Sequence, residues 1–276
     1  MEPQEAWKRL EKALLSALNT VLRRWASQRL HRAYAGATRV YVELEKGWCG
    51  SALTPTWLAW HPPRIDPSTA TPRQLARLAG RTANPLAAAY AVAAVNAATT
   101  AYIASTPGAA PRPLRPGEEP EALGASRGAR VVMLGYMPGL ARTLAGVGAH
   151  IILVADYARQ LLERAISDGY TVTWAGDLGR IRDAIAGSDL VVFSGSAVLD
   201  PPTLLTEASW AREAGARTAL VGPTSSFHPA VARELGVDKI LGAYVDPRLC
   251  PRLAASTAAG GGLRGVRGRL VYWAWG

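Results

Sequence analysis

Three glycine-containing turns hold most of the residues in this chain that could bind a ligand. The turns span Gly135–Gly139, Ser194–Ser196 and Gly222–Ser226, and each follows a short apolar run. Glycine permits a tight turn and a close approach of a ligand to backbone N–H groups, while serine and threonine add hydroxyl groups. We expect these groups to hold an anionic or polar ligand through hydrogen bonds. The candidate ligand-binding residues are Gly135, Tyr136, Pro138, Ser194, Gly195, Ser196, Gly222, Pro223 and Thr224.

Two carboxylates accompany the turns. Asp156 lies about twenty residues after Gly135, at the end of the next strand-like run, where dinucleotide-binding folds place a ribose-binding acid. The favoured interpretation of Asp156 is a cap for a helix beginning at Tyr157. Asp200 precedes another helix. Its two interpretations, a helix cap and a ligand contact, have equal weight. As metal ligands, the oxygens of Asp156 and Asp200 would suit an ion such as Mg²⁺ or Mn²⁺ better than a soft heavy metal.

The sequence lacks the signatures of several well-known sites. Gly135–Gly139 is not a GxGxxG dinucleotide fingerprint, and Ser194–Ser196 lacks the GxSxG spacing of a nucleophile elbow. The histidines and cysteines show no zinc-type spacing, and His228 is interpreted as a surface or capping residue. Cys49 and Cys250 are predicted to be two ordinary thiols. A disulfide between them is the alternative, unusual in cytosol outside hyperthermophiles.

The turns are positioned by an alternation of strand-like and helix-like segments in the second half of the chain. Continuous apolar runs bounded by turn signals indicate strands buried on both faces, and intervening helices make them parallel neighbours. Ligands bind outside the carboxyl ends of such strands. The expected strands are Arg130–Leu134, His150–Ala155, Thr171–Trp174, Leu190–Phe193, Thr218–Val221 and Lys239–Tyr244. The expected helices are Gly139–Ala145, Tyr157–Ser167, Leu178–Ala186, Pro202–Ala214 and Pro229–Leu235.

The first part of the chain predicts a small α+β unit. Apolar residues at helical spacing indicate one helix over Glu5–Arg29, and alternation over Arg39–Glu45 indicates a half-buried strand. Lys46-Gly47 is predicted to be a turn, Trp48–Leu53 a returning strand, and Pro72–Leu78 and Pro85–Ser105 two helices. On the second of these, Asn96 either reaches the ligand cleft or is a core amide that links the helix to the hairpin. The aromatic end, Leu270–Trp275, is expected to dock as an extra strand or clamp.

The predicted organisation is an α+β domain over residues 1–110, a linker rich in proline and glycine over 111–128, and a Rossmann-like domain over 129–276. The net charge of +10 comes mostly from arginine, and no basic run is longer than two residues. We therefore attribute it to a genomic or thermophilic preference and expect no nucleic-acid partner. Residues 83–104 are mostly alanine and predict a packed core helix instead of a membrane span. With no visible signal peptide, the expected compartment is cytoplasmic.

Several of these segments together resemble the putative heavy-metal chelation family. The resemblance lies in the Gly-Tyr-x-Pro turn at Gly135, in Ser188–Asp200, in Ala219–Thr224, and in the Ala93–Ala97 helix segment. The glycine-bearing hairpin over Gly47–Thr54 also matches. The resemblance implies a doubly wound, mostly parallel Rossmann-like sheet behind a small domain similar to the N-terminal domain of enolase.

This resemblance implies a protein that binds a heavy metal or another small ligand in the cleft between the two domains. A divalent ion or a metal-chelating metabolite is the expected ligand, with a metal complex favoured over a bare ion. An alternative is a transferase or lyase using a nucleotide-type cofactor such as S-adenosylmethionine at Gly135–Gly139 and Asp156. A third hypothesis is a structural subunit whose tryptophan-rich tail forms an interface, and a homo-oligomer is compatible with each. Whether the chain is an enzyme stays open at the level of sequence.

Overall fold

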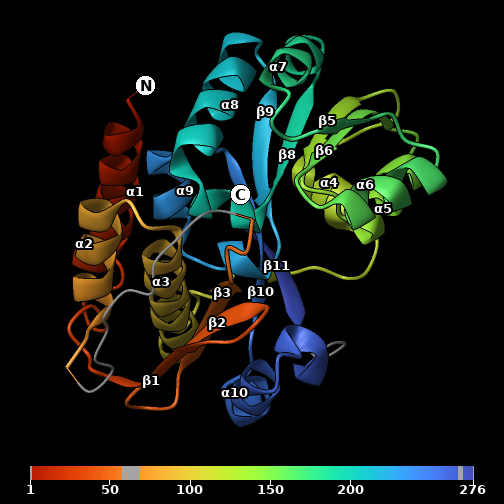
Figure 1. Ribbon diagram of the computed structural model, residues 1–276. Coiled ribbons are helices and arrows are strands. Elements are labelled where there is room, and N and C mark those ends of the chain that lie inside the picture. The colour runs from red at the N-terminus through yellow and green to blue at the C-terminus, as the bar shows by residue number, and fades with distance from the viewer. Residues whose placement is uncertain (1, 58–68, 267–269, 276) are drawn as a thin grey trace.

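A computed structural model describes residues 2–57, 69–266 and 270–275. Its centre is an eight-stranded sheet in the order β4-β11-β10-β9-β8-β5-β6-β7 (Figure 1). The strands from β5 to β10 run parallel, and β11 and β4 complete one edge in antiparallel pairing. The bounds are β4 Arg112–Pro113, β5 Arg130–Leu134, β6 His150–Asp156, β7 Val172–Trp174, β8 Leu190–Ser194, β9 Arg217–Val221, β10 Lys239–Tyr244 and β11 Val271–Trp275.

Helices cover both faces of this sheet, so the fold is a Rossmann-like, doubly wound α/β sheet, as predicted. Side chains of α4, α5 and α6 pack in one apolar cluster, and those of α7, α8 and α9 pack in another. Two faces of helices are needed because the central strands are apolar along their whole length. The bounds are α4 Glu119–Leu123, α5 Pro138–Gly146, α6 Arg159–Ser167, α7 Leu178–Ala186, α8 Pro201–Glu213 and α9 Pro229–Glu234.

The first part of the chain forms a three-stranded antiparallel sheet and three helices. The sheet order is β1-β2-β3, and the turn at Lys46-Gly47 joins β2 to β3 as expected. The bounds are α1 Pro3–Asn19, β1 Leu30–Ala35, β2 Arg39–Leu44, β3 Cys49–Leu53, α2 Pro72–Thr82 and α3 Pro85–Ser105. The sequence over Trp57–Pro72 is rich in proline and predicts an irregular stretch, and most of it lies outside the described residues.

Three expectations for this part were wrong. The first helix ends at Asn19 instead of Arg29, and turns follow it up to Ser27. Strand β1 was not expected, although it pairs with β2 along most of its length. Strand β2 is not half-buried, because Tyr41, predicted to face outward, is fully buried. Its ring belongs to an apolar cluster with residues of the C-terminal segment, which therefore covers the second face of the hairpin.

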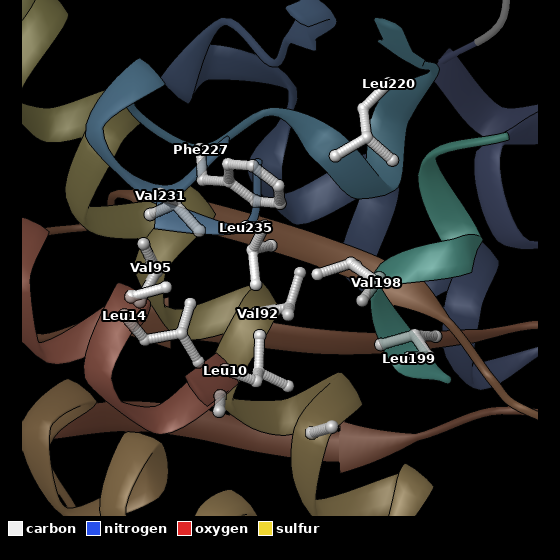
Figure 2. Close-up of a cluster of buried hydrophobic side chains, with 14 of the residues drawn as sticks. Leu10, Leu14, Val92, Val95, Val198, Leu199, Leu220, Phe227, Val231 and Leu235 are labelled. Carbon is white, nitrogen blue, oxygen red and sulfur yellow. The ribbon is translucent and has the colours of Figure 1, made fainter. Parts of the chain in front are cut away.

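The core is continuous between the two parts of the molecule. Figure 2 shows Leu10 of α1 and Val92 of α3 close to Leu235, beyond α9, and Val198. The same cluster contains Leu220 of β9, in the large sheet. Packing of α1 and α3 against the Rossmann-like part fixes the hairpin β2–β3 over one end of the large sheet.

Helix α3 is the only helix among the described residues that is long and apolar enough to be compared with a membrane span. By length and composition it could cross a membrane, but 83% of its most apolar window is buried inside the protein. Asn84 caps it by accepting hydrogen bonds from the backbone N–H groups of Leu86 and Ala87 at 2.9 and 3.1 Å. The burial confirms the predicted packed helix, whose small alanine side chains let neighbouring backbones approach closely.

The C-terminal segment differs from the prediction at its cysteine. Cys49 of β3 and Cys250 form a disulfide, so the expectation of two ordinary thiols was wrong. Cys250 begins helix α10, Cys250–Ala258, which packs against the hairpin. The aromatic end forms strand β11, which pairs with β10, so the extra strand is the expected alternative that the structure shows. The rings of Trp273 and Tyr244 stack with their centroids 4.7 Å apart. The segment expected to be a linker contains β4 and α4.

Candidate functional site

The predicted ligand edge contains the point where the strand order reverses. From β5 the chain proceeds to β6 and β7 on one side and then returns to β8 on the other side of β5. In open α/β sheets, a crevice forms at such a switch point beyond the carboxyl ends of the strands. Gly135 follows β5 directly and has φ of +90°, and a Cβ at this position would collide with the Cβ of Ser194 at the end of β8. Glycine is therefore required where these two turns meet.

A cavity of about 460 Å³ lies at this switch point. We call it the first cavity. Three carboxylates line it, on Asp156, Asp200 and Glu207, together with the hydroxyl-bearing side chains of Ser194 and Ser196. Leu53 at the end of the hairpin and Thr56 and Trp57 beyond it also line the cavity, so both parts of the chain contribute to it. The apolar lining includes Leu53, Trp57, Leu134, Leu161 and Leu204.

Asp156 holds two backbone segments together. Its carboxylate accepts hydrogen bonds from the N–H groups of Tyr136 and Ala158, both at 2.7 Å. Burial raises the pKa of Asp156, and these hydrogen bonds oppose that shift. Helix α6 begins at Arg159 instead of Tyr157, so Asp156 closes a turn before the helix. Its main structural effect is to fix the Gly135 turn of β5 against the end of β6.

Glu207 is the site residue that the sequence analysis missed. It lies on α8, is 4% exposed, and has a pKa raised to about 8 by burial and by the negative charge of Asp200. At neutral pH its carboxyl group is therefore mostly protonated and can donate a hydrogen bond. A single acidic residue between apolar positions at helical spacing was the signal that could have found it, because Leu204 and Ala211 lie three residues before and four residues after it and are buried too.

Tyr136 lines the first cavity, but its hydroxyl group is committed elsewhere. That hydroxyl donates a 2.5 Å hydrogen bond to the carboxylate of Asp168, which follows α6. Burial and the Asp168 carboxylate both raise the pKa of Tyr136. The ring of Tyr136 therefore shapes the floor while its hydroxyl anchors the end of a neighbouring helix.

A second cavity of about 420 Å³ adjoins the first. The two cavities share Leu53, Ser194 and Ser196, and the hydroxyl groups of the two serines lie 2.9 Å apart in a hydrogen bond. The second cavity lies between the start of α5 and the turns after β8 and β9. Its lining includes Arg39, Pro138, Gly195, Gly222, Pro223 and Thr224.

Asn96 lines neither cavity. Its amide group donates to the backbone carbonyls of Ser51 and Thr224 at 2.9 and 3.0 Å, and the residue is buried. The hydroxyl of Thr224 accepts a further bond from the backbone N–H of Leu53 at 3.1 Å. Asn96 thus joins α3 to the hairpin and to the turn after β9. Every other candidate binding residue from the sequence lies on one of the two cavities.

Among the described residues, the side chains of the first cavity form no metal site of their own. Within the described ranges, no group of three His, Cys, Asp or Glu side chains is arranged to hold a metal ion. Both oxygens of Asp156 accept backbone hydrogen bonds, and Glu207 is largely neutral. Because a metal ligand must be deprotonated, these groups do not fit a bare ion held by protein ligands alone.

His228 is the N-cap residue of α9, in agreement with its interpretation as a capping residue. Its Nδ1 atom accepts a hydrogen bond from the backbone N–H of Ala230 at 3.2 Å, at the start of α9. Burial, followed by the charge of Arg233, lowers the pKa of His228 to about 4, so the ring is neutral at physiological pH. The residue contributes to the structure of the helix terminus and lines neither cavity.

Comparison with known proteins places this fold in one family. Two solved structures of unknown function from the DUF364 family resemble the chain. The one from Pyrococcus horikoshii has a TM-score of 0.71 and 17% identity, covering 98% of this chain and 99% of its own. The one from Desulfitobacterium hafniense DCB-2 has a TM-score of 0.67 and 17% identity, covering 95% and 98%. No curated protein matches the chain. The DUF364 family model, described as "Putative heavy-metal chelation", matches residues 120–275, and the chain therefore belongs to this family.

Proposed function

We propose that this protein binds a small organic molecule in the first cavity, and that a heavy-metal ion enters only as part of such a molecule, already chelated. The volume of about 460 Å³ falls in the range of small-molecule sites, which are mainly apolar with a few polar groups. The site lies at the switch point of the sheet, where this fold class binds ligands. The observation that carries the proposal is the set of carboxyl groups in this cavity, which among the described residues lack the three-ligand arrangement that would hold a bare ion.

The chemistry of the lining indicates what the molecule should present. Protonated Glu207 donates a hydrogen bond, so an oxygen or an unprotonated nitrogen suits it. Asp200 adds a carboxylate at the start of α8 and favours an amine or another cationic group. The surrounding leucines and Trp57 offer an apolar surface for the body of the ligand. A chelator that carries amines satisfies these requirements whether or not a metal is bound to it.

Equilibrium dialysis with metal analysis tests the proposal. The probes are Ni²⁺ alone and Ni²⁺ with an excess of free histidine, a small chelator that bears an amine. We expect retention of nickel only with histidine, and a loss of at least tenfold in affinity in Asp200→Asn. Glu213→Gln is the matched control, because Glu213 is an exposed acid on the same helix. Stoichiometric retention of bare Ni²⁺, or equal retention by Asp200→Asn, would contradict the proposal.

A nucleotide-type cofactor is a second candidate for the same cavity. The observation that favours it is the position of Asp156 at the tip of β6 beside the Gly135 turn, which matches the ribose-binding acid of dinucleotide folds. The sulfonium of S-adenosylmethionine would also suit the acidic lining. A thermal-shift titration with S-adenosylmethionine and adenosine tests it, since a ligand of the native state raises Tm. A rise with these compounds and no retention of the nickel–histidine complex would favour the cofactor over the chelate.

A further inference from the structure

The second cavity contains a buried positive charge that the proposed function does not use. Arg39 begins β2 and is 6% exposed. Its Nε donates to the hydroxyl of Ser51 at 3.1 Å, and an Nη donates to the hydroxyl of Thr224 at 3.4 Å. Both acceptors are neutral, and no carboxylate of the described chain forms an ion pair with Arg39.

An uncompensated buried charge is costly, which makes its position on a cavity informative. Desolvation of an ion destabilises the folded chain unless an opposite charge or good hydrogen bonds compensate it. Burial lowers the pKa of Arg39 to about 10, so the guanidinium is still charged at neutral pH. It lines the second cavity and can form further hydrogen bonds, because a guanidinium has five N–H donors.

The start of α5 contributes a second, independent preference for an anion. Pro138, Gly139 and Leu140 line the cavity, and the N-cap residue Met137 makes no side-chain capping bond. Backbone N–H groups in the first turn of a helix have no partner within the helix, and the helix dipole adds partial positive charge there. Helix N-termini of this kind bind anions.

One acidic side chain, that of Glu119, also lines this cavity. Glu119 lies on α4, and one oxygen of its carboxylate accepts a hydrogen bond from the backbone N–H of Gly117 at 2.8 Å. It forms no ion pair with Arg39 among the described residues, and it is not among the charges that shift the pKa of Arg39. Among the described residues, the charge of Arg39 therefore has hydrogen-bond acceptors but no carboxylate as a counter-ion.

We propose that the second cavity is a subsite for an anionic oxygen group, a carboxylate or a phosphate, with Arg39 as its counter-ion. The inference rests on the proposed function, because the two cavities share Leu53 and the Ser194–Ser196 turn, so one ligand can occupy both. Its amine would lie near Asp200 and its anionic group near Arg39. A molecule with amine and carboxylate groups has this charge pattern, and both groups are also metal ligands.

Calorimetric titration of the full chain tests the subsite with two probes, inorganic phosphate and succinate, at constant ionic strength against sodium chloride. We expect the wild-type chain to bind at least one probe, and the stronger probe distinguishes phosphate from carboxylate. Arg39→Gln should weaken binding at least tenfold, and Arg39→Lys by a smaller factor, since lysine keeps the charge without the planar fork. Arg77→Gln, an exposed arginine on α2, should bind as wild type does.

Equal anion binding by wild type and Arg39→Gln would overturn the subsite, as would no binding of either probe to wild type. If the Arg39 variants do not fold, selenate soaked into crystals of the wild-type protein decides. Anomalous density within hydrogen-bond distance of the Arg39 guanidinium supports the subsite, and density elsewhere or none opposes it. These probes carry neither metal nor amine, so the subsite can fail while the nickel–histidine complex still binds in the first cavity, and the reverse outcome is equally distinct.

Discussion

Asp200 and Glu207 both line the first cavity from α8, and the charge of Asp200 adds to burial in raising the pKa of Glu207 to about 8. Asp200 is the N-cap residue of the helix, and Glu207 lies about two turns further along the same side. Ionising both carboxyl groups in the same cavity is unfavourable, so one of them stays protonated and can donate a hydrogen bond at neutral pH. The cavity therefore carries an acceptor and a donor in place of two equal negative charges.

Replacing Glu207 should remove a specific pH dependence of stability. The folded pKa of about 8 exceeds the ordinary value of 4.5, so between these values the folded chain binds more protons than the unfolded chain. The free energy of unfolding should then fall as pH rises through this window, by at most about 1.4 kcal/mol per pH unit. We expect Glu207→Gln to lose this slope and to be more stable than wild type at pH 8.5, measured by urea unfolding.

Glu213→Gln is the control for this prediction. Glu213 ends α8 and is exposed, so its removal should leave the pH profile of wild type in place. If Glu207→Gln kept the wild-type slope between pH 5 and 8, Glu207 would be ionised in the folded protein. The hydrogen-bond donor assigned to the first cavity would then be absent.

The sequence predicted the parallel sheet well because its signals are local. The apolar residues of a run such as Leu190–Phe193 are consecutive in the sequence, and a glycine turn follows soon after the run. All six predicted strands of the Rossmann-like part are present in the described structure, with bounds shifted by one residue at most. The binding edge followed from the same pattern, since the carboxyl ends of parallel strands meet at one edge.

The features that the sequence did not predict depend on contacts between distant residues. Arg39 and Tyr41 alternate with Val40 and Val42, which indicates a face exposed to solvent. The C-terminal segment covers that face, and the hydroxyl oxygen of Tyr41, which donates to the carboxylate of Glu43 at 2.9 Å, lies 3.4 Å from the carbonyl oxygen of Cys250. No local pattern in β2 reports a neighbour so far along the chain. The burial of Arg39 was missed for the same reason, and the Cys49–Cys250 disulfide was predicted only as the alternative to two ordinary thiols.

His228 should produce a pH dependence of the opposite sign. Its folded pKa of about 4 is below the ordinary 6.5, so the unfolded chain binds more protons between these values. Stability from this group is therefore present above pH 6.5 and is lost as pH falls towards 4. We expect His228→Asn to flatten that part of the unfolding profile while keeping the cap of α9, because asparagine is a good N-cap.

The matched control is His31→Asn, which changes an exposed histidine on β1. Its profile between pH 4 and 6.5 should match that of wild type. An unchanged profile in His228→Asn would mean that the ring of His228 takes up a proton as readily in the folded chain as in the unfolded one.

The disulfide should contribute strongly to stability. It joins β3 to the start of α10 across a sequence separation of 201 residues, so its loss frees a very long loop in the unfolded chain. The loop-closure model gives about 5 kcal/mol for a loop of this size. We expect Cys49→Ala/Cys250→Ala to lose that amount in urea unfolding at neutral pH. Dithiothreitol should destabilise wild type and leave the double variant unchanged. Free thiols in the purified wild-type chain, counted by mass spectrometry after alkylation, would contradict the linkage.

Gly135→Ala should disturb the switch point more than an ordinary glycine replacement. The backbone of Gly135 has φ of +90°, and an added Cβ would collide with the Cβ of Ser194, which cannot rotate away because the backbone fixes it. Positive φ alone costs a residue other than glycine roughly 1–2 kcal/mol, and overpacking adds roughly 1–3 kcal/mol. We expect a loss of about 3 kcal/mol in urea unfolding.

Gly169→Ala separates the two causes, because Gly169 also has positive φ, of +87°, but has open space where its Cβ would lie. It should lose only the smaller, conformational part and should bind the nickel–histidine complex as wild type does. In Gly135→Ala, relief of the collision moves the turn that Asp156 holds through the Tyr136 amide, so binding should fall along with stability. Equal losses in the two variants would mean that β5 and β8 can separate at their carboxyl ends without cost, and the cavity between them would not be a fixed feature of the fold.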